Sequence, residues 1–255
     1  MKSRPAKKKP QPWFLLIDVS NSFTKLALAS REKLLEIKRI PTPGLSARSL
    51  RKATASWEFG VAVVSSVVPK TKKALAKFLK KTKTLHVGPK LNLGVGIDYP
   101  KPASIGADRL ANAAGVVALV GAPAVVVDFG TAVTFDIISP GKKYIGGVIA
   151  PGLQVMTDYL YHRTALLPKI DLAEPVAAVG KSTRAAMMAG AVFGYRGLVK
   201  QILEEIRREI GRPRGLKVVA TGGYAELIAA KLPEIENVHP NLTLEGLRII
   251  AILNS

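Results

Sequence analysis

The chain contains no cysteine among its 255 residues. Disulfide bonds, thiolate metal sites and cysteine nucleophiles are therefore excluded, and the composition is compatible with a reducing cytoplasm. Long apolar runs are also lacking, since the most apolar stretch, residues 115–127, is interrupted by Gly121 and Pro123. Such a stretch is typical of a helix end followed by a buried strand. We therefore expect no membrane span and a cytoplasmic location.

Aromatic and acidic residues are scarce. Aromatics make up 6% of the chain, and 38 Lys and Arg against 18 Asp and Glu give a formal net charge of +20. Such a charge attracts phosphates, nucleic acid or anionic membranes, but nucleic-acid binding also needs aromatic side chains that stack on bases. We therefore do not expect nucleic acid as a partner. Residues 1–12 are predicted to form a basic disordered tail, and residues 70–83 an amphipathic helix with a solvated lysine face.

A strand, loop and strand pattern occurs twice in the chain. An apolar run at residues 13–17 ends in Asp18, and a second apolar run follows a polar loop at residues 25–29. The same order recurs within residues 124–138, where the first apolar run ends in Asp128. One Asp at a strand end is ordinary in a turn, but two in register favour a functional role. The remaining alternation of strands and helices predicts an α/β protein.

The two loops carry groups suited to phosphoryl transfer, which depends mainly on positioning and charge stabilisation. The polar residues 20–22 offer hydrogen-bond donors for phosphate oxygens, and Lys25 adds a nearby cation. Gly130 and Thr131 offer donors from the opposite side. Gly222, after another apolar strand, would let the backbone approach a flat adenine ring, although an ordinary connecting turn is the common alternative.

Acidic side chains accompany these loops. Asp18 and Asp128 are hard oxygen ligands for Mg²⁺ or for a monovalent cation. In the segment GADR, Asp108 follows a glycine at the apparent start of a helix, where an ionised carboxylate is favoured. The adjacent Arg109 could grip a substrate carboxylate, so the pair could position an acidic substrate and deprotonate its hydroxyl. The ordinary alternative is a helix-opening Asp beside an exposed Arg.

Seven segments, taken in order, resemble the type III pantothenate kinases, and the resemblance covers nearly everything from Phe14 onward. The segments are LLIDVSNSFTKLAL, SSVVP, GIDYPKPASIGADRLANAAG, VVVDFGTAVTFDII, YIGGVIAPGLQVM, VGKSTRAAMMAGAVFGYRGLV and VVATGGYAELI. The resemblance implies ATP-dependent phosphorylation of pantothenate to 4'-phosphopantothenate, the first step of coenzyme A biosynthesis. It also implies a homodimer of the actin-like ATPase and sugar kinase superfamily, whose two ribonuclease H-like lobes hold ATP between them. We expect these lobes at residues 13–120 and 121–255.

The resemblance also implies roles for individual residues. Asp108 would be the catalytic base, Asp128 would bind K⁺ or NH₄⁺, and the Mg²⁺ that accompanies the nucleotide is assigned to Asp18. With Gly222 from the reading above, the expected ATP-binding residues are Asp18, Val19, Ser20, Asn21, Ser22, Phe23, Thr24, Lys25, Gly130, Thr131 and Gly222. The expected pantothenate-binding residues are Tyr99, Gly106, Ala107, Asp108, Arg109 and Thr183.

The first loop departs from the family pattern Asp-x-Gly-Asn-Thr, because Ser20 replaces the glycine and Ser22 the threonine. We expect Ser22 to keep the hydroxyl, and Ser20 to weaken ATP binding if the loop requires a backbone conformation that only glycine adopts readily. Two other readings remain open at this point. The first is a non-catalytic relative that binds nucleotide or nucleic acid as a regulator, and the second is a kinase of the superfamily with another substrate.

Overall fold

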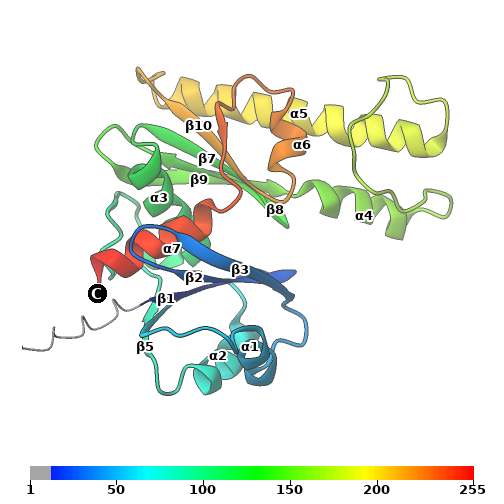
Figure 1. The fold of residues 1–255 in the computed structure, drawn as a ribbon. Helices are drawn as coiled ribbons and strands as arrows, with labels where there is room; N and C mark the ends of the chain where they lie inside the picture. The colour runs from blue at the N-terminus through cyan, green and yellow to red at the C-terminus, as the bar shows by residue number, and fades with distance from the viewer. Residues whose placement is uncertain (1–12) are drawn as a thin grey trace, which may run out of the picture.

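The computed structural model describes residues 13–255, and the predicted basic tail lies outside this range. Two sheets with helices on their faces make up the protein (Figure 1). The predicted α/β class is confirmed. Among the described residues, no helix combines the length and the apolar character that crossing a bilayer requires.

The first sheet has the strand order β3-β2-β1-β4-β5. β1 runs antiparallel to β2, as the predicted hairpin requires, and parallel to β4. All six residues of β1 are buried, which explains its continuous apolar run, because a central strand covered on both faces needs no polar side. The strands are β1 (Phe14–Val19), β2 (Phe23–Ala29), β3 (Leu34–Pro41), β4 (Val61–Ser66) and β5 (Lys83–His86).

The second sheet repeats this arrangement in the order β11-β10-β7-β8-β9, with β6 added beside β9. β7 runs antiparallel to β8 and parallel to β10, as β1 does to β2 and β4. Asp18 and Asp128 are each the fifth residue of the equivalent strands β1 and β7, so the predicted duplication is confirmed. The strands are β6 (Gly96–Ile97), β7 (Ala124–Phe129), β8 (Ala132–Ile138), β9 (Lys143–Pro151), β10 (Lys217–Gly222) and β11 (Asn237–Val238).

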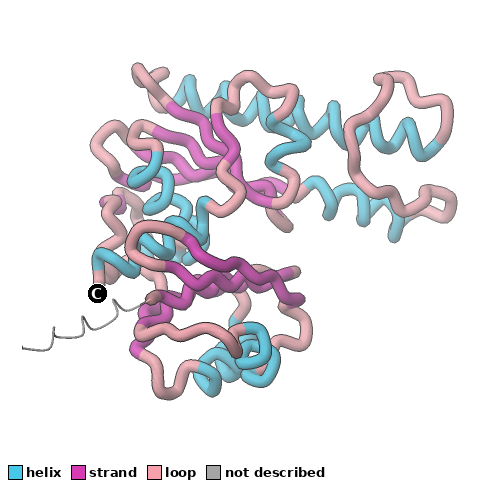
Figure 2. The backbone as a smooth tube through the Cα atoms, viewed as in Figure 1, coloured by secondary structure: helices cyan, strands magenta, loops and turns pink. Residues whose placement is uncertain are grey.

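Helices form three layers around the two sheets (Figure 2). α3 and α7 lie between the sheets and share one core with both, whereas separate cores cover the outer face of each sheet. α1 and α2 lie on the outer face of the first sheet, and α5 and α6 on that of the second. The helices are α1 (Ala47–Ala53), α2 (Lys72–Phe78), α3 (Ala107–Leu119), α4 (Leu153–Arg163), α5 (Thr183–Glu209), α6 (Ala225–Ala229) and α7 (Leu242–Leu253); short 3₁₀ turns occupy Pro69–Thr71 and Pro102–Ser104.

The helix predicted over residues 70–83 is shorter in the structure. α2 ends at Phe78, and Lys83 already begins β5, which pairs with β4 at the edge of the sheet. The apolar side of the prediction holds, since Leu75 and Leu79 are buried in the outer core. The prediction extended the helix too far because the lysines between Phe78 and Lys83 also fit a helical pattern, although they lead into the strand.

Glycines allow α3 and α7 to cross in close contact. A Cβ at Gly246 would lie 1.8 Å from the carbonyl oxygen of Ala111, and one at Gly115 would lie 2.8 Å from that of Leu242. A real Cβ needs more than 3 Å, so only glycine fits the crossing. The close approach fixes the two helices as a single layer between the sheets.

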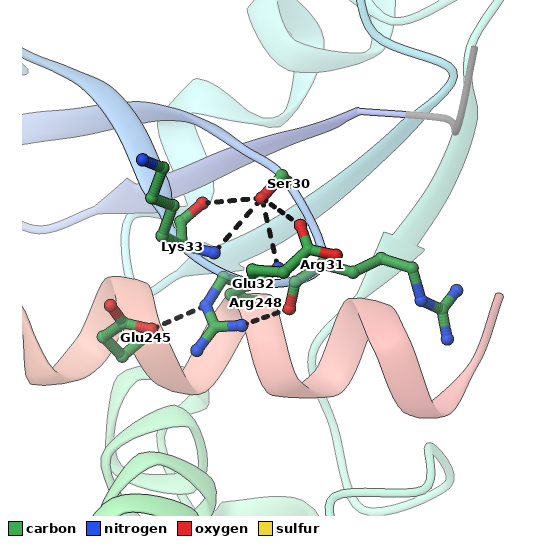
Figure 3. A network of polar contacts seen from close by, with 6 residues as sticks. All are labelled: Ser30, Arg31, Glu32, Lys33, Glu245 and Arg248. Carbon is green, nitrogen blue, oxygen red and sulfur yellow. Dashed lines mark hydrogen bonds and ion pairs between the residues drawn. The ribbon is translucent and has the colours of Figure 1, made fainter.

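α7 is also tied to the turn between β2 and β3 (Figure 3). Arg248 donates hydrogen bonds to the carbonyl oxygen of Arg31 and, over 2.7 Å, to the carboxylate of Glu245. The C-terminal helix therefore contacts the first sheet, whereas β6, which precedes residue 120, pairs with β9 of the second sheet. Each half of the chain thus contacts the sheet of the other, and the division into lobes at 13–120 and 121–255 stays a prediction.

Candidate active site

The β1–β2 and β7–β8 loops meet between the two sheets. The hydroxyl oxygens of Ser22 and Thr131 lie 3.5 Å apart, although they come from different sheets. Both loops line a pocket of about 310 Å³, called here the interlobe pocket. Its lining consists of Asp18, Ser20, Ser22, Phe23, Lys25, Arg39, Asp128, Phe129, Gly130, Thr131, Gln154, Val155, Asp158, Gly222, Gly223, Tyr224 and Thr243.

The interlobe pocket includes most, but not all, of the residues expected to bind ATP. Val19 and Thr24 are completely buried beneath it, and the hydroxyl of Thr24 lies 2.9 Å from that of Thr42. Asn21 is exposed at the loop tip and does not line the pocket. Val19 and Thr24 therefore support the loop from below.

Ser20 has an unstrained backbone. Among the described non-glycine residues only Lys142 and Arg212 have a positive φ, so position 20 does not require glycine. The backbone N–H of Ser20 donates to the carbonyl oxygen of Phe23 over 3.1 Å and closes the loop. The first loop therefore keeps a regular hairpin turn despite the serine.

Gly222 does need to be glycine. Its φ is +93°, and a Cβ there would lie 2.6 Å from backbone atoms of Phe129 on the neighbouring strand. Phe129 immediately precedes the second loop. The glycine thus lets the end of β10 pack closely against that loop. Close backbone packing explains why glycine is required at this position in the pocket wall.

Asp18 is nearly buried and receives a hydrogen bond of 3.1 Å from the Ser65 hydroxyl. Burial, and to a lesser extent the negative charge of Asp108, raise the pKa of Asp18 to about 7, while Lys25 acts in the opposite direction. Burial also raises the pKa of Asp128, again with a contribution from Asp108. The two loop carboxylates and Asp108 therefore share one electrostatic site.

A chain of hydrogen bonds holds the carboxylate of Asp128. The side-chain amide of Asn112 on α3 donates to Asp128 Oδ2 over 2.9 Å, and the Thr243 hydroxyl on α7 donates to Asn112 Oδ1 over 2.8 Å. Asn112 is completely buried. Our sequence analysis missed both residues, although a polar residue within the buried stripe of α3 is a detectable signal because a buried amide needs partners.

Asp108 lies in the first turn of α3, for which Gly106 is the N-cap. Its Oδ1 accepts a hydrogen bond of 2.8 Å from the backbone N–H of Arg109. Burial raises the pKa of Asp108, while this hydrogen bond and the charge of Arg109 partly offset the shift. A Cβ at Gly106 would lie 2.6 Å from Asp108 Oδ1, so the glycine makes room for the carboxylate.

Arg109 binds a carboxylate of the protein itself. Its Nε donates to Asp136 Oδ1 over 2.6 Å, and the Tyr144 hydroxyl donates to the same oxygen over 3.1 Å. Within residues 13–255, the buried atoms Arg109 Nη2 and Asp136 Oδ2 have no hydrogen-bond partner. The Nε edge of the guanidinium is thus occupied by Asp136, a residue that our sequence analysis did not single out.

The residues expected to bind pantothenate fall in two places. Tyr99 packs edge-on against Tyr144, with ring centroids 6.0 Å apart, and so lies beside the Arg109 and Asp136 pair. Thr183 is the exposed first residue of α5. This end of α5 extends with α4 away from α3 (Figure 1). One copy of the chain therefore does not bring Thr183 to the GADR segment.

Comparisons with known proteins identify the family to which the chain is similar. A family model described as type III pantothenate kinase matches residues 14–205. The type III pantothenate kinase of Akkermansia muciniphila is 53% identical over 244 residues, which cover 94% of this chain and 99% of that protein. The corresponding protein of Methylacidiphilum infernorum is 41% identical over 92% of this chain and 87% of its own length.

Solved structures share the fold. A Campylobacter jejuni protein, titled a Baf family transcriptional activator, superposes with a TM-score of 0.61 at 20% identity over 93% of this chain and 97% of its own. The activator of 2-hydroxyisocaproyl-CoA dehydratase from Clostridium difficile, solved with bound ADPNP, gives 0.52 at 12% identity over 94% and 93%. At these identities the likeness concerns the fold alone, and it supports the predicted two-lobed, actin-like architecture.

Proposed function

The chain belongs to the type III pantothenate kinase family, and on this premise we propose that it phosphorylates pantothenate with ATP, using Asp108 as the base. The reaction yields 4'-phosphopantothenate and ADP, and it is the first step of coenzyme A biosynthesis. Because ATP is the donor, we place the reaction in the cytoplasm. The observation that carries the proposal is the contact between Ser22 and Thr131, which brings the two loops to one pocket.

ATP is proposed to bind with its phosphates between these loops. The hydroxyls of Ser22 and Thr131 and the backbone N–H groups around them supply donors, and Lys25 and Arg39 supply positive charge in the pocket wall. The Arg39 guanidinium lies 3.5 Å from the centre of the Phe23 ring, which holds it at the rim of the pocket. The part of the pocket lined by Gly223 and Tyr224 is proposed to take the adenine.

The acidic residues fit a cation. Burial raises the pKa of both Asp18 and Asp128, so a bound cation would favour their ionised forms. Residues 13–255 contain no group of three or more His, Cys, Asp or Glu side chains that could hold a metal alone. Mg²⁺ would therefore bind chiefly through the ATP phosphates, with Asp18 beside it, and K⁺ or NH₄⁺ would bind at Asp128. Such cations would offset the charge that develops on the phosphates.

Asp108 is proposed to accept the proton of the attacking hydroxyl. It lies at a helix start and interacts electrostatically with Asp18 and Asp128, so it is close to the proposed phosphate position. Its raised pKa brings it nearer to the working pH, which suits a general base. The pair of Arg109 and Asp136 anchors this helix start, and Tyr99 packs against Tyr144, which bonds to the same pair.

A homodimer is proposed because one copy leaves Thr183 apart from the other pantothenate residues. The surface of α4 and α5 offers an interface, since Tyr159 is 60% exposed and Leu166, in the loop that follows α4, is 90% exposed. A hollow of about 880 Å³ lies between these helices, lined by residues such as Val155, Met156, Leu160, Met187 and Gly190. A second copy on this surface would bury these apolar groups and bring its own Thr183 to the substrate site.

The test is an ADP-release assay on the purified full chain with pantothenate, MgATP and K⁺. We expect ADP formation that depends on pantothenate and falls by about 10² to 10⁴ in Asp108→Asn, as for loss of a general base. Glu58→Gln, the same change at an exposed position on the outer face, is the control and should keep full activity. Near-normal turnover in Asp108→Asn would remove Asp108 from the role of base.

A further inference from the structure

A second pocket lies in the first lobe, outside the proposed site. It has a volume of about 580 Å³, sits between α2 and the strands β4 and β5, and is called here the outer pocket. Its apolar wall includes Val64, Leu75 and Leu79, which are buried in the outer core. Figure 1 shows α2 on the face of the first sheet that points away from the second sheet. The outer pocket is therefore separate from the interlobe pocket.

The polar lining of the outer pocket is basic. Lys72 and His86 contribute to its wall, together with the hydroxyl residues Ser66 and Thr84. No ion pair joins Lys72 to another residue within 13–255. The surrounding segment, residues 42–97, contains eleven Lys and Arg but a single acid, Glu58. The excess of positive charge around the pocket favours an anionic ligand and disfavours a cationic one.

One strand connects the outer pocket with the proposed active site. Ser66, the last residue of β4, lines the outer pocket, and the preceding Ser65 donates its hydrogen bond to Asp18. Successive residues of a strand point to opposite faces of the sheet. The end of β4 therefore places Ser66 in the outer pocket and bonds Ser65 to Asp18 of the interlobe pocket, so a shift of this strand end would displace the Asp18 carboxylate.

We propose that the outer pocket binds a small amphipathic anion and that its occupancy changes the affinity for ATP. The apolar body lies against Val64, Leu75 and Leu79, and a carboxylate or phosphate group meets Lys72. The coupling through β4, unlike the binding itself, rests on the proposed ATP site.

Binding is tested by calorimetry with octanoate, octyl phosphate and the neutral octan-1-ol. We expect both anions to bind wild type, and Lys72→Ala to raise their dissociation constants about tenfold, because a charge-assisted contact is lost. Lys73→Ala removes a neighbouring cation of the same helix that does not line the pocket. This control should change the dissociation constants of the two anions by less than about twofold. Three results would overturn the site. The two substitutions could have equal effects, octan-1-ol could bind as tightly as octanoate, or neither anion could bind.

Coupling is tested with Ala76→Trp, which places a large side chain in the outer pocket at an exposed lining position. We expect saturating octanoate to change the KM for ATP in wild type about threefold or more and to have no effect in this variant. Thermal unfolding of the variant serves as the control that it is folded. An unchanged KM in wild type with octanoate bound would overturn the coupling. If pantothenate-dependent ADP release is absent altogether, the proposed function fails, whereas the Lys72-dependent binding of octanoate still decides the outer pocket.

Discussion

Ser22 Oγ lies 3.5 Å from Thr131 Oγ1, although 109 positions separate the two residues in the chain. Ser22 lies in the loop after β1 and Thr131 in the loop after the equivalent strand β7, so the two equivalent loops face each other across the interlobe pocket. In the proposed complex, one phosphate chain is held by both lobes at once. The relative position of the lobes then becomes part of the ATP site.

The first prediction concerns these two hydroxyls. Ser22→Ala and Thr131→Ala should each raise the KM for ATP about tenfold, because a hydrogen bond to a charged phosphate is lost, which costs about 1.5–3 kcal/mol. Steady-state kinetics on the single and double variants measure their coupling. Ser56→Ala, on the exposed surface of the first lobe, should leave the KM unchanged. Wild-type values in both single variants would contradict the proposed phosphate position.

The second prediction concerns Ser20. Its backbone is not in a conformation that favours glycine, so Ser20→Gly should change the KM for ATP by less than about twofold. The added freedom of the unfolded chain should lower the free energy of unfolding by about 0.5 kcal/mol. Kinetics and urea denaturation check the two parts. A large fall in the KM would show that the serine side chain itself obstructs ATP.

The third prediction concerns the support of Asp128. Thr243→Val removes the donor that orients Asn112, so the amide no longer holds the Asp128 carboxylate. We expect the K⁺ concentration for half-maximal activity to rise about tenfold, as is typical when a residue behind a metal ligand is lost. Thr243→Ser keeps the hydroxyl and should behave as wild type. Equal K⁺ dependence in both variants would argue against a cation at Asp128.

The fourth prediction concerns the helix crossing. Gly246→Ala places a Cβ against the carbonyl of Ala111 and should lower the free energy of unfolding by about 2 kcal/mol or more. Gly197→Ala on α5 is the matched control, because no atom outside the adjoining helix backbone lies within 4 Å of its new Cβ. This control should raise stability by about 0.5–1 kcal/mol, the helix propensity gained over glycine. Thermal and urea unfolding of the two variants should therefore shift in opposite directions.

The fifth prediction concerns pH. Burial raises the pKa of Asp18 from its ordinary 3.8 to about 7, so the folded state binds this proton more tightly than the unfolded state. Protonation of Asp18 therefore adds to the free energy of unfolding. This added stability is complete below about pH 4 and is lost as the pH rises to about 7. Urea denaturation without nucleotide should therefore show lower stability at pH 8 than at pH 5.5. Asp18→Asn should reduce this difference, and an unchanged difference would contradict the shifted pKa.

The fold was largely predictable because its signals are local. The two apolar runs that end in Asp18 and Asp128 predicted both hairpins, and the segment GADR predicted the start of α3. The extent of α2 was not predictable, since a lysine-rich segment with two buried leucines fits both a helix and the approach to an edge strand. Tertiary pairing with β4 decided where the helix ends.

The candidate site was only partly predictable. Residues in loops, such as Ser22 and Thr131, are marked by their position after a strand. Thr243 and Asp136 act through contacts between elements distant in sequence, and their positions carry no such mark. Asn112 is marked only as a polar residue within an apolar helical stripe, which does not reveal its partner Asp128. The role of Arg109 depends on the same kind of contact, because only the folded chain shows that its nearest carboxylate is Asp136.

The repeated order of the two sheets gives the molecule an internal pseudo-symmetry. Both halves present an Asp at the same strand position and a hydroxyl-bearing loop after it, so equivalent positions of two like units face each other across the interlobe pocket. The two loops are unequal: that of the first half spans residues 20–22 and carries Ser20, whereas that of the second spans residues 130–131 and carries Gly130. The two sides of the pocket are therefore related in backbone arrangement but differ in the groups they offer to a ligand.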